Sequence, residues 1–322
     1  MLVSAIVLVG CTSAASGPLP DNPLQRRLVA DVSGANARPH LEELQRIADN
    51  NDGNRASPGP GYDASVDYVV GILRNAGYEV STPTYPVDDT NVRNVIAQTR
   101  TGNPDRVVMA GTHLDSVEAG PGINDNGSGV AALLEIAMRL GGSPPVRNAV
   151  RFAWWGSEET GLKGSTHYVE MLSEDDRDRI MCYVNIDMVA SPNVGYLVQG
   201  GKGFGSRSGP KGSATVGRVL AEQLAATGVT AEITEFEYRD SDFAPFIEAG
   251  IPSGGVLSGD SQEKTEEQAE RWGGQAGEVY DRCYHRACDR LDNVNPTALD
   301  RFTDALAGTV AHFVMSTDGL AS

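Results

Sequence analysis

Three short apolar runs in this sequence each lead into side chains that can bind a metal ion. These side chains are His113 and Asp115 after the first run, Glu158 and Glu159 after the second, and Asp187 after the third. The carboxyl ends of parallel strands meet at one edge of a sheet, and binding sites form just beyond that edge. If the three runs are parallel strands, all of these side chains therefore lie on one rim of the molecule.

A glycine-rich turn between the first two runs adds another carboxylate. In residues 121–129, an asparagine flanks Asp125 on each side, and an apolar helix pattern follows directly. Each side chain alone has an ordinary alternative role: Asp125 could cap the helix, and His113 could simply be hydrogen-bonded. Their occurrence together at successive strand ends favours a metal site.

The charges and donor types of these residues fit two zinc ions. Asp125, Glu159 and Asp187 supply three negative charges, which together with one hydroxide balance two divalent ions. The imidazoles of His113 and His285 complete a nitrogen and oxygen ligand set of the kind that zinc accepts. One further carboxylate, Glu158, remains outside this set and is free to act as a base.

The elements that must position these residues alternate along the chain. Strands are predicted at 78–80, 92–97, 107–111, 149–155, 180–188, 230–236 and 251–257. Helices are predicted at 41–48, 65–76, 129–140, 162–172, 216–226 and 296–313. This alternation predicts one α/β domain, with a mainly parallel central sheet flanked by helices on both faces.

Several segments of the sequence resemble the M28 metallopeptidases. They are 111–116 (GTHLDS), 122–129 (GINDNGSG), 152–159 (FAWWGSEE) and 185–188 (NIDM). The segment 281–289 (DRCYHRACD) is similar to a subgroup of secreted aminopeptidases from Streptomyces. The resemblance covers about residues 29–315. It implies the zinc-exopeptidase fold and a co-catalytic two-zinc aminopeptidase.

The resemblance also implies how the metal ligands are shared. Asp125 would bridge the two zinc ions. One ion would be completed by His113 and Asp187, and the other by Glu159 and His285. In the family, the peptide bond that follows the bridging aspartate is cis, and the same is expected after Asp125.

Catalytic and substrate-binding roles follow from the same resemblance. Glu158 would be the general acid and base, Asp115 would orient the His113 ring as a carboxylate behind the ligands, and Tyr284 would hydrogen-bond the developing oxyanion. A pocket for a large hydrophobic N-terminal residue would be lined by Met188 and Leu257. Both of these apolar side chains could equally be ordinary core residues.

A calcium ion is a further expectation. Asp300 and Asp304 lie four residues apart in the last predicted helix, and Asp31 precedes the first. With the Val32 carbonyl, these carboxylates would form an all-oxygen set suited to Ca²⁺. The alternative is that the two helical acids are simply solvated.

The first residues are typical of an export signal. Residues 2–10 are mainly apolar but too short to cross a membrane, which needs about 20 residues. The sequence before Cys11 matches a bacterial lipobox, whereas a plain secretory signal would be removed together with that cysteine. We therefore divide the chain into a signal region at 1–17, a Pro-rich linker at 18–30 and a peptidase domain at 31–318. The predicted location is outside the cytoplasm, as a cell-surface lipoprotein or a secreted protein.

The remaining cysteines agree with export. Cys283 and Cys288 lie five residues apart, and in an oxidising compartment such a pair is expected to form a disulfide. Cys182 lies in an apolar run and is expected to be a buried free thiol.

Net charge and length narrow the choice of partners. The 322 residues carry a formal charge of −17, which argues against nucleic acid and against a membrane partner other than through a lipid anchor. The expected partners are peptides with a free N-terminus, and the expected state is a monomer. The alternatives are a related zinc carboxypeptidase or acylase, a one-zinc glutaminyl cyclase, and a non-catalytic surface binding protein on a peptidase-like fold.

Overall fold

The computed structural model describes residues 22–201, 209–236 and 239–320. The strands in these ranges are β1 (Glu79–Ser81), β2 (Thr84–Val87), β3 (Thr90–Arg93), β4 (Val95–Gln98), β5 (Asn103–His113), β6 (Asn148–Trp155), β7 (Ile180–Asp187), β8 (Leu197–Gln199), β9 (Glu232–Thr234) and β10 (Ser253–Leu257). The α-helices are α1 (Pro23–Asp31), α2 (Gly34–Asp49), α3 (Pro60–Asn75), α4 (Gly127–Leu140), α5 (Lys163–Glu170), α6 (Glu174–Asp178), α7 (Ser213–Ala226), α8 (Phe243–Glu248), α9 (Glu266–Trp272) and α10 (Pro296–Phe313). The predicted signal region and Cys11 lie outside the described residues.

Eight of these strands form one mixed sheet, in the order β1-β4-β6-β5-β7-β10-β8-β9. The central strands β6, β5, β7 and β10 run parallel to one another. On the two sides, β4 is antiparallel to β6 and β8 is antiparallel to β10. The predicted mainly parallel sheet is therefore confirmed.

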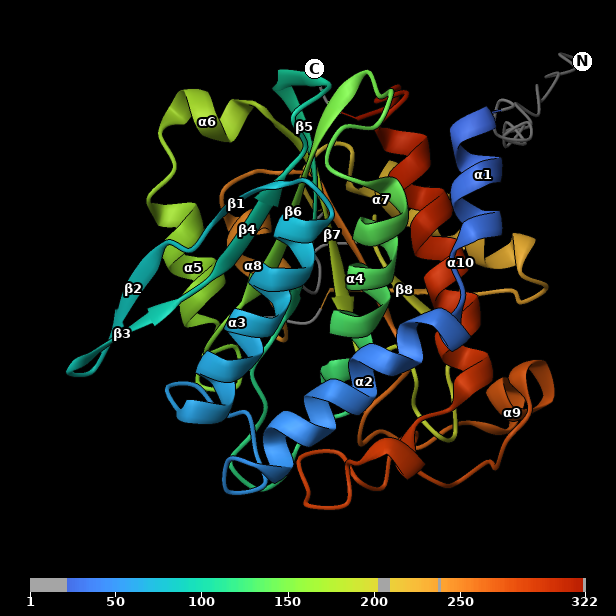
Figure 1. Ribbon diagram of the computed structural model, residues 1–322. Helices are drawn as coiled ribbons and strands as arrows, with labels where there is room; N and C mark the ends of the chain where they lie inside the picture. The colour runs from blue at the N-terminus through green and yellow to red at the C-terminus, as the bar shows by residue number, and fades with distance from the viewer. Residues whose placement is uncertain (1–21, 202–208, 237–238, 321–322) are drawn as a thin grey trace, which may run out of the picture.

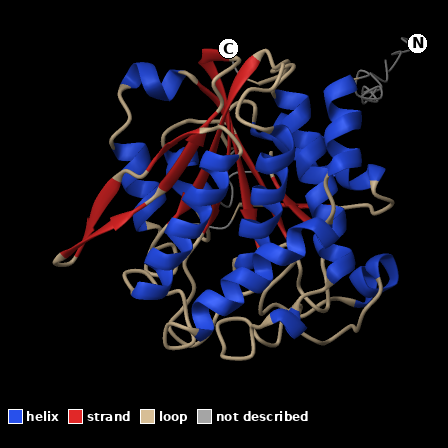
Figure 2. Cartoon of the chain, viewed as in Figure 1, coloured by secondary structure: helices blue, strands red, loops and turns tan. Residues whose placement is uncertain are grey.

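Helices cover both faces of the sheet (Figures 1 and 2). The larger core cluster lies under α1, α2, α3, α4, α7 and α10, and the smaller one under α5 and α8. Strand β5 contributes side chains to both clusters, since Val108 and Ala110 belong to the larger cluster and Met109 to the smaller. Successive side chains of a strand point to opposite faces, so the apolar run of β5 is the expected sequence of a strand buried on both sides.

The prediction of a linker at 18–30 is wrong for the described residues of that range, because most of them form α1. Asn22 caps this helix, and its side-chain oxygen accepts two helix amides, while a proline occupies the first helical position. The Asn22 amide also donates to the Ala311 carbonyl of α10, at 2.8 Å. Leu24 and Leu28 are buried in the main core. Among the described residues, the folded domain therefore includes α1 and extends before residue 31.

The predicted strand at 92–97 is interrupted at Asn94, between β3 and β4. The buried Asn94 side chain accepts the Gly156 amide at 3.2 Å and donates to the Gly164 carbonyl at 2.9 Å. The side chain therefore holds the loop that follows β6, while the Asn94 backbone amide donates to the Pro83 carbonyl at 2.9 Å. That loop carries two of the predicted site residues, so the break in the strand contributes to their position.

The three cysteines in the described residues behave as predicted. Cys283 and Cys288 form a disulfide, with their Cα atoms 5.2 Å apart. Cys182 is a buried free thiol in β7. Within the described ranges, no helix is long and apolar enough to cross a membrane.

Candidate metal centre

The carboxyl ends of β5, β6 and β7 bring the predicted site residues to one edge of the sheet. His113 is the last residue of β5 and Asp187 the last of β7. Glu159 lies in the turn that follows β6. Because β5 is parallel to both neighbouring strands, these residues converge although they are far apart in the sequence.

Asp125 lies between two imidazole rings. Its Oδ1 is 3.3 Å from His113 Nε2, and its Oδ2 is 3.1 Å from His285 Nε2. His113 Nε2 is also 3.4 Å from Asp187 Oδ1, and His285 Nε2 is 3.0 Å from Glu159 Oε2. The ligand atoms therefore form two groups that share Asp125, one oxygen to each group.

A backbone feature expected from the family resemblance is also present at Asp125. The peptide bond between Asp125 and Asn126 is cis. Asn126 then caps α4 and accepts the Gly129 amide. The turn therefore ends in a helix immediately after the residue that faces both imidazoles.

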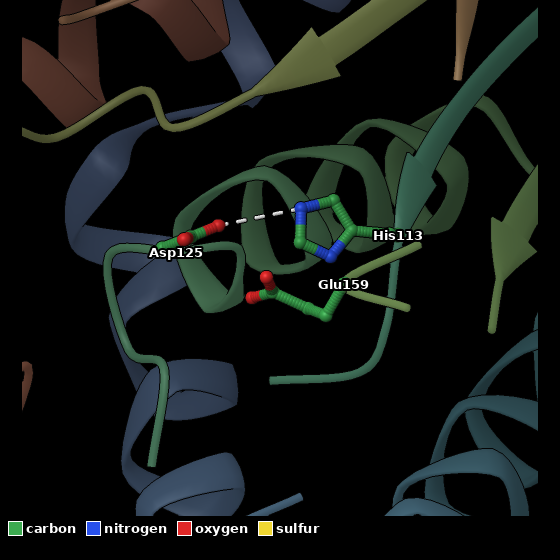
Figure 3. A group of neighbouring side chains, drawn as sticks. All are labelled: His113, Asp125 and Glu159. Atoms are coloured by element: carbon green, nitrogen blue, oxygen red, sulfur yellow. Dashed lines mark ion pairs between the residues drawn. The ribbon is translucent and has the colours of Figure 1, made fainter. Parts of the chain in front are cut away.

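The distances and the donor types fit zinc. Two ligands of a tetrahedral zinc ion, each about 2.1 Å from it, lie about 3.4 Å apart, which matches the separations within each group. His113, Asp125 and Glu159 form a compact group whose ligand atoms lie within 4.8 Å of one another. Figure 3 shows these side chains converging on one space from separate segments. In the described residues, the buried Glu159 Oε1 has no hydrogen-bond partner, so it is available as a ligand atom.

The protonation of the His113 ring also suits a ligand. His113 Nδ1 lies 3.2 Å from the backbone carbonyl of Asp115. A carbonyl oxygen only accepts, so Nδ1 carries the hydrogen and donates it. In the neutral ring, Nε2 then has its lone pair directed toward Asp125 and Asp187.

Burial, hydrogen bonds and nearby charges shift the pKa values of the site. Burial, followed by the charge of Asp125, raises the pKa of Glu159 to about 7. Burial also raises the pKa of Glu158 well above its usual range, and the carboxylate of Asp242 adds to this effect. Conversely, hydrogen bonds to Asp125 and Glu159 raise the pKa of His285 to about 10. Bound divalent cations would relieve this concentration of negative charge.

The predicted role of Asp115 requires a correction. Its carboxylate was expected to orient the His113 ring, but the nearest carboxylate oxygen is 3.8 Å from Nδ1 and the Asp115 carbonyl makes the hydrogen bond instead. The carboxylate accepts the amides of Glu158 and Glu159, at 3.2 and 3.3 Å. A buried carboxylate needs several donors, and these two successive amides supply them. Asp115 therefore positions the loop after β6 as well as the imidazole.

A small cavity opens beside the ligands. Its other walls are formed by Glu158, Met188, Asp240, Leu257, Asp260 and Tyr284. The Tyr284 ring stacks on His285, with centroids 3.8 Å apart. The predicted residues Glu158, Tyr284, Met188 and Leu257 therefore share one cavity with the predicted ligands, whereas Asp115 does not line it. Asp240 and Asp260, for which we made no prediction, also line it.

Sequence reasoning missed the role of Ser241. Its hydroxyl donates to Asp187 Oδ2 at 2.6 Å and accepts from the Asn185 side chain at 2.9 Å. Asn185 lies two residues before Asp187 on β7. The signal available in the sequence was only a Ser-Asp pair, which does not indicate a partner so far along the chain.

Arg55 was also missed. Its side chain is fully buried and donates to the carbonyls of Pro121 at 3.0 Å, Gly122 at 2.7 Å and Leu114. These acceptors belong to the segment between His113 and Asp125. A single arginine in a polar stretch gives no sequence signal of such a role.

The predicted calcium ligands are only partly brought together. Burial, followed by the charge of Asp300, raises the pKa of Asp304 to about 6. Asp300 Oδ1 also accepts the Gly34 amide at 2.8 Å, which connects α10 to α2. In the described ranges, Asp31 does not join these two carboxylates in a compact group of three. The calcium site remains a prediction.

The fold and this centre together define a candidate metallohydrolase of the α/β class, and comparison with known proteins places it in a family. A model of Peptidase family M28 matches residues 94–310. The chain belongs to this family, as the resemblance indicated.

Relatives in this family include named aminopeptidases. Leupeptin-inactivating enzyme 1 of Streptomyces exfoliatus is 46% identical over 280 residues, which is 86% of this chain and 61% of that protein. An aminopeptidase of Pseudomonas aeruginosa is 50% identical over 257 residues, which is 79% of this chain and 45% of that protein. This chain thus spans less than two thirds of the length of either relative.

A third relative and two solved structures extend the comparison. The "Probable lipoprotein aminopeptidase LpqL" of Mycobacterium tuberculosis is 35% identical, over 92% of this chain and 89% of its own length. The zinc aminopeptidase BSAP from Bacillus subtilis matches with a TM-score of 0.58 and 28% identity, over 71% of this chain and 52% of that one. An aminopeptidase from Aneurinibacillus matches with a TM-score of 0.71 and 17% identity, over 92% and 97%. This last likeness concerns the fold alone.

Proposed function

We propose that the chain is a two-zinc aminopeptidase that removes a large hydrophobic residue from the N-terminus of peptides. The observation that carries this proposal is the pair of ligand groups that share the two oxygens of Asp125. Relatives named as aminopeptidases and a similar structure described as a zinc aminopeptidase support it.

The ligands divide between the two ions according to their distances. His113 and Asp187 would hold one zinc ion, Glu159 and His285 would hold the other, and Asp125 would serve both. This assignment uses each short contact between an imidazole and a carboxylate in the centre. It leaves Glu158 outside the ligand set.

The chemistry then depends on groups of this chain that move or hold a proton. When bound, zinc polarises the peptide carbonyl and makes a water molecule more acidic. Glu158 accepts the proton of the attacking water on its carboxylate and delivers it to the nitrogen of the leaving amine. The Tyr284 hydroxyl donates to the carbonyl oxygen as negative charge develops there. Burial raises the pKa of Tyr284, so this hydroxyl stays protonated at neutral pH.

The charge of the cavity supports removal of the terminal residue and not of an internal one. The free α-amine of a peptide is a cation, and the cavity walls carry Glu158 and Asp260 beside the ligands. An acylated N-terminus has no such charge. The side chain of the terminal residue would lie against Met188 and Leu257.

The test uses two substrates that differ only at the amine. We expect the zinc-loaded protein to hydrolyse leucine p-nitroanilide and to leave its N-acetylated form intact. Cleavage of N-acyl amino acids instead would support the acylase alternative. Absence of turnover on all of these substrates would support a binding protein.

We also propose that the protein is exported as a monomer and acylated on Cys11, with one Ca²⁺ between α1 and α10. The relative named as a lipoprotein supports the anchor. Fractionation of cells that express the wild type or Cys11→Ala tests it. A variant that remains with the membrane as completely as the wild type would contradict acylation at this residue.

A further inference from the structure

The loop that carries Asp125 and the loop that carries His285 meet at a buried carboxylate, Asp289. Its Oδ1 accepts the amide of Asn124 at 2.8 Å, and its Oδ2 accepts the amide of Asp125 at 2.9 Å. The backbone carbonyl of Asp289 accepts the amide of Ile123 at 3.1 Å. Three successive backbone amides of the Asp125 loop therefore all donate to Asp289.

The hydrogen-bond pattern requires a carboxylate at this position. The Asn293 side chain is a further donor to Asp289 Oδ1, at 3.1 Å, so both oxygens act only as acceptors. Asp289 is 2% exposed, and water does not readily replace a lost partner there. An asparagine of the same shape would turn an N–H toward one of the two backbone amides.

The two loops are also in direct backbone contact. A Cβ atom added to Gly120 would lie 2.4 Å from the Arg286 carbonyl oxygen, so only glycine allows this approach. Asp289 directly follows Cys288, whose disulfide with Cys283 closes the loop that carries His285. The carboxylate that holds the Asp125 amide is thus fixed to the segment that holds the second imidazole.

We propose that Asp289 is a positioning residue that sets the Asp125 carboxylate between His113 and His285. It acts through the Asp125 amide and touches neither the metal ligand atoms nor the substrate. The inference rests on the proposed two-zinc function, because Asp125 must face both imidazoles only if it bridges two ions. The two carboxylate oxygens of Asp125 contact different imidazole rings. A displaced Asp125 backbone would therefore weaken both groups of ligands.

The chain offers a matched control in Asp281. This carboxylate is also buried, at 1% exposure, and belongs to the same polar network, since the Asn124 side chain donates to it at 2.7 Å. It accepts the Cys283 amide at 2.7 Å and does not receive the Asp125 amide, which is donated to Asp289. Asp281→Asn therefore removes the same charge from the same network and leaves the contact with the Asp125 amide in place.

The experiment compares the wild type, Asp289→Asn and Asp281→Asn in a zinc titration against a competing chelator. The titration is run where circular dichroism shows all three proteins folded. We expect Asp289→Asn to lose about tenfold or more in affinity for both zinc ions. At saturating zinc its kcat should fall while its KM for leucine p-nitroanilide stays close to the wild-type value. Asp281→Asn should bind both ions within about threefold of the wild type, although it melts at a lower temperature. Equal losses of zinc affinity in the two variants would overturn the proposal.

A second variant covers the case in which Asp289→Asn does not fold. Asp289→Glu keeps the charge and adds one methylene, so it should fold but displace the Asp125 amide and bind both ions more weakly. Wild-type zinc affinity and kcat in this variant would overturn the proposal. Failure of the proposed function has a different signature, because the wild type itself would then bind fewer than two zinc ions or lack aminopeptidase activity.

Discussion

At the scale of single residues, the centre depends on polar groups that lie behind the predicted ligands. Asp115 holds the amides of Glu158 and Glu159, and Ser241 donates to Asp187. Each contact satisfies a buried polar group and at the same time fixes the direction of a ligand or a proton carrier. Removing such a group has two effects, a loss of stability and a loss of precision at the centre.

For Arg55 we expect the loss of stability to dominate. Arg55→Met removes the donor from three buried carbonyls, those of Leu114, Pro121 and Gly122. An unsatisfied buried acceptor costs about 1–3 kcal/mol. We therefore expect the free energy of unfolding in urea to fall by roughly 3 kcal/mol or more.

The control for Arg55 is the exposed Arg100. Its guanidinium also donates to a carbonyl, that of Gly77, and pairs with Glu79 on the surface. Because water can replace these contacts, Arg100→Met should change the unfolding free energy by less than about 1 kcal/mol. Similar losses in both variants would show that burial of Arg55 does not have the importance assigned to it.

For Tyr284 we expect the effect on the centre, and not the loss of stability, to dominate. Tyr284→Phe keeps the ring that stacks on His285 and removes only the hydroxyl. We expect kcat for leucine p-nitroanilide to fall about 10²-fold, with little change in KM or zinc affinity. Tyr280→Phe is a suitable control, because that hydroxyl is donated to Gln268 outside the cavity of the ligands. A wild-type kcat in Tyr284→Phe would remove the hydroxyl from the mechanism.

At the scale of elements, the packing of α2 on α3 contains a pH-sensitive contact. His40 of α2 is 6% exposed, and its Nδ1 lies 2.6 Å from the Tyr68 hydroxyl of α3. Burial lowers the pKa of His40 from 6.5 to about 4. The unfolded chain therefore binds a proton at His40 over a range of pH in which the folded protein does not.

This difference predicts a loss of stability in acid. The contribution of neutral His40 is complete above pH 6.5 and is lost as the pH falls to about 4. It amounts to roughly 3 kcal/mol. Urea unfolding of zinc-free wild type and His40→Gln at pH 7 and pH 4 measures it. We expect the wild type to lose about that much more than the variant, and parallel losses would contradict this role of His40.

The elements differ in how well the sequence predicts them. Helix α10 has the predicted bounds because its signals coincide: Asn295 caps it, a proline opens it and the apolar period continues to its end. The helix α1 was mistaken for a linker because it is short and its proline suggested a loop. The break at Asn94 depends on contacts of its side chain with Gly156 and Gly164, which local patterns do not contain.

At the scale of the whole molecule, an acidic chain concentrates several carboxylates at one edge of its sheet. The formal net charge is −17, and burial raises the pKa of Glu159 in the centre to about 7. Cations bound at that edge stabilise the folded state selectively, because the unfolded chain does not bring the ligands together. Bound zinc is therefore expected to increase the free energy of unfolding.

Removal of zinc tests this expectation. We expect the melting temperature to drop on the order of 10 °C after chelation, and to recover when zinc is returned. Magnesium at the same concentration should not restore it, because two imidazoles suit zinc better than they suit magnesium. An unchanged melting temperature after complete removal of the metal would contradict the link between zinc and the fold.

The five proposed ligands could be named from sequence because strand ends and a family resemblance mark them. The supporting residues could not, since their contacts join distant segments. Arg55 donates to a carbonyl 67 residues away, and Asp289 accepts an amide 164 residues away. Nothing in the local sequence around either residue indicates its partner. The chemistry of the site is thus evident from short motifs, whereas its rigidity emerges only from the folded chain.

The most direct test of the proposed chemistry is the zinc content and turnover of Glu158→Ala, measured on the same preparation. Glu158 lines the cavity but lies outside the two ligand groups. We expect two zinc ions per chain with wild-type affinity, and a kcat for leucine p-nitroanilide lower by about 10²–10⁴-fold. The exposed Glu170, changed to alanine, should leave both quantities unchanged. Wild-type turnover by zinc-loaded Glu158→Ala would contradict the assignment of the proton carrier and the mechanism built on it.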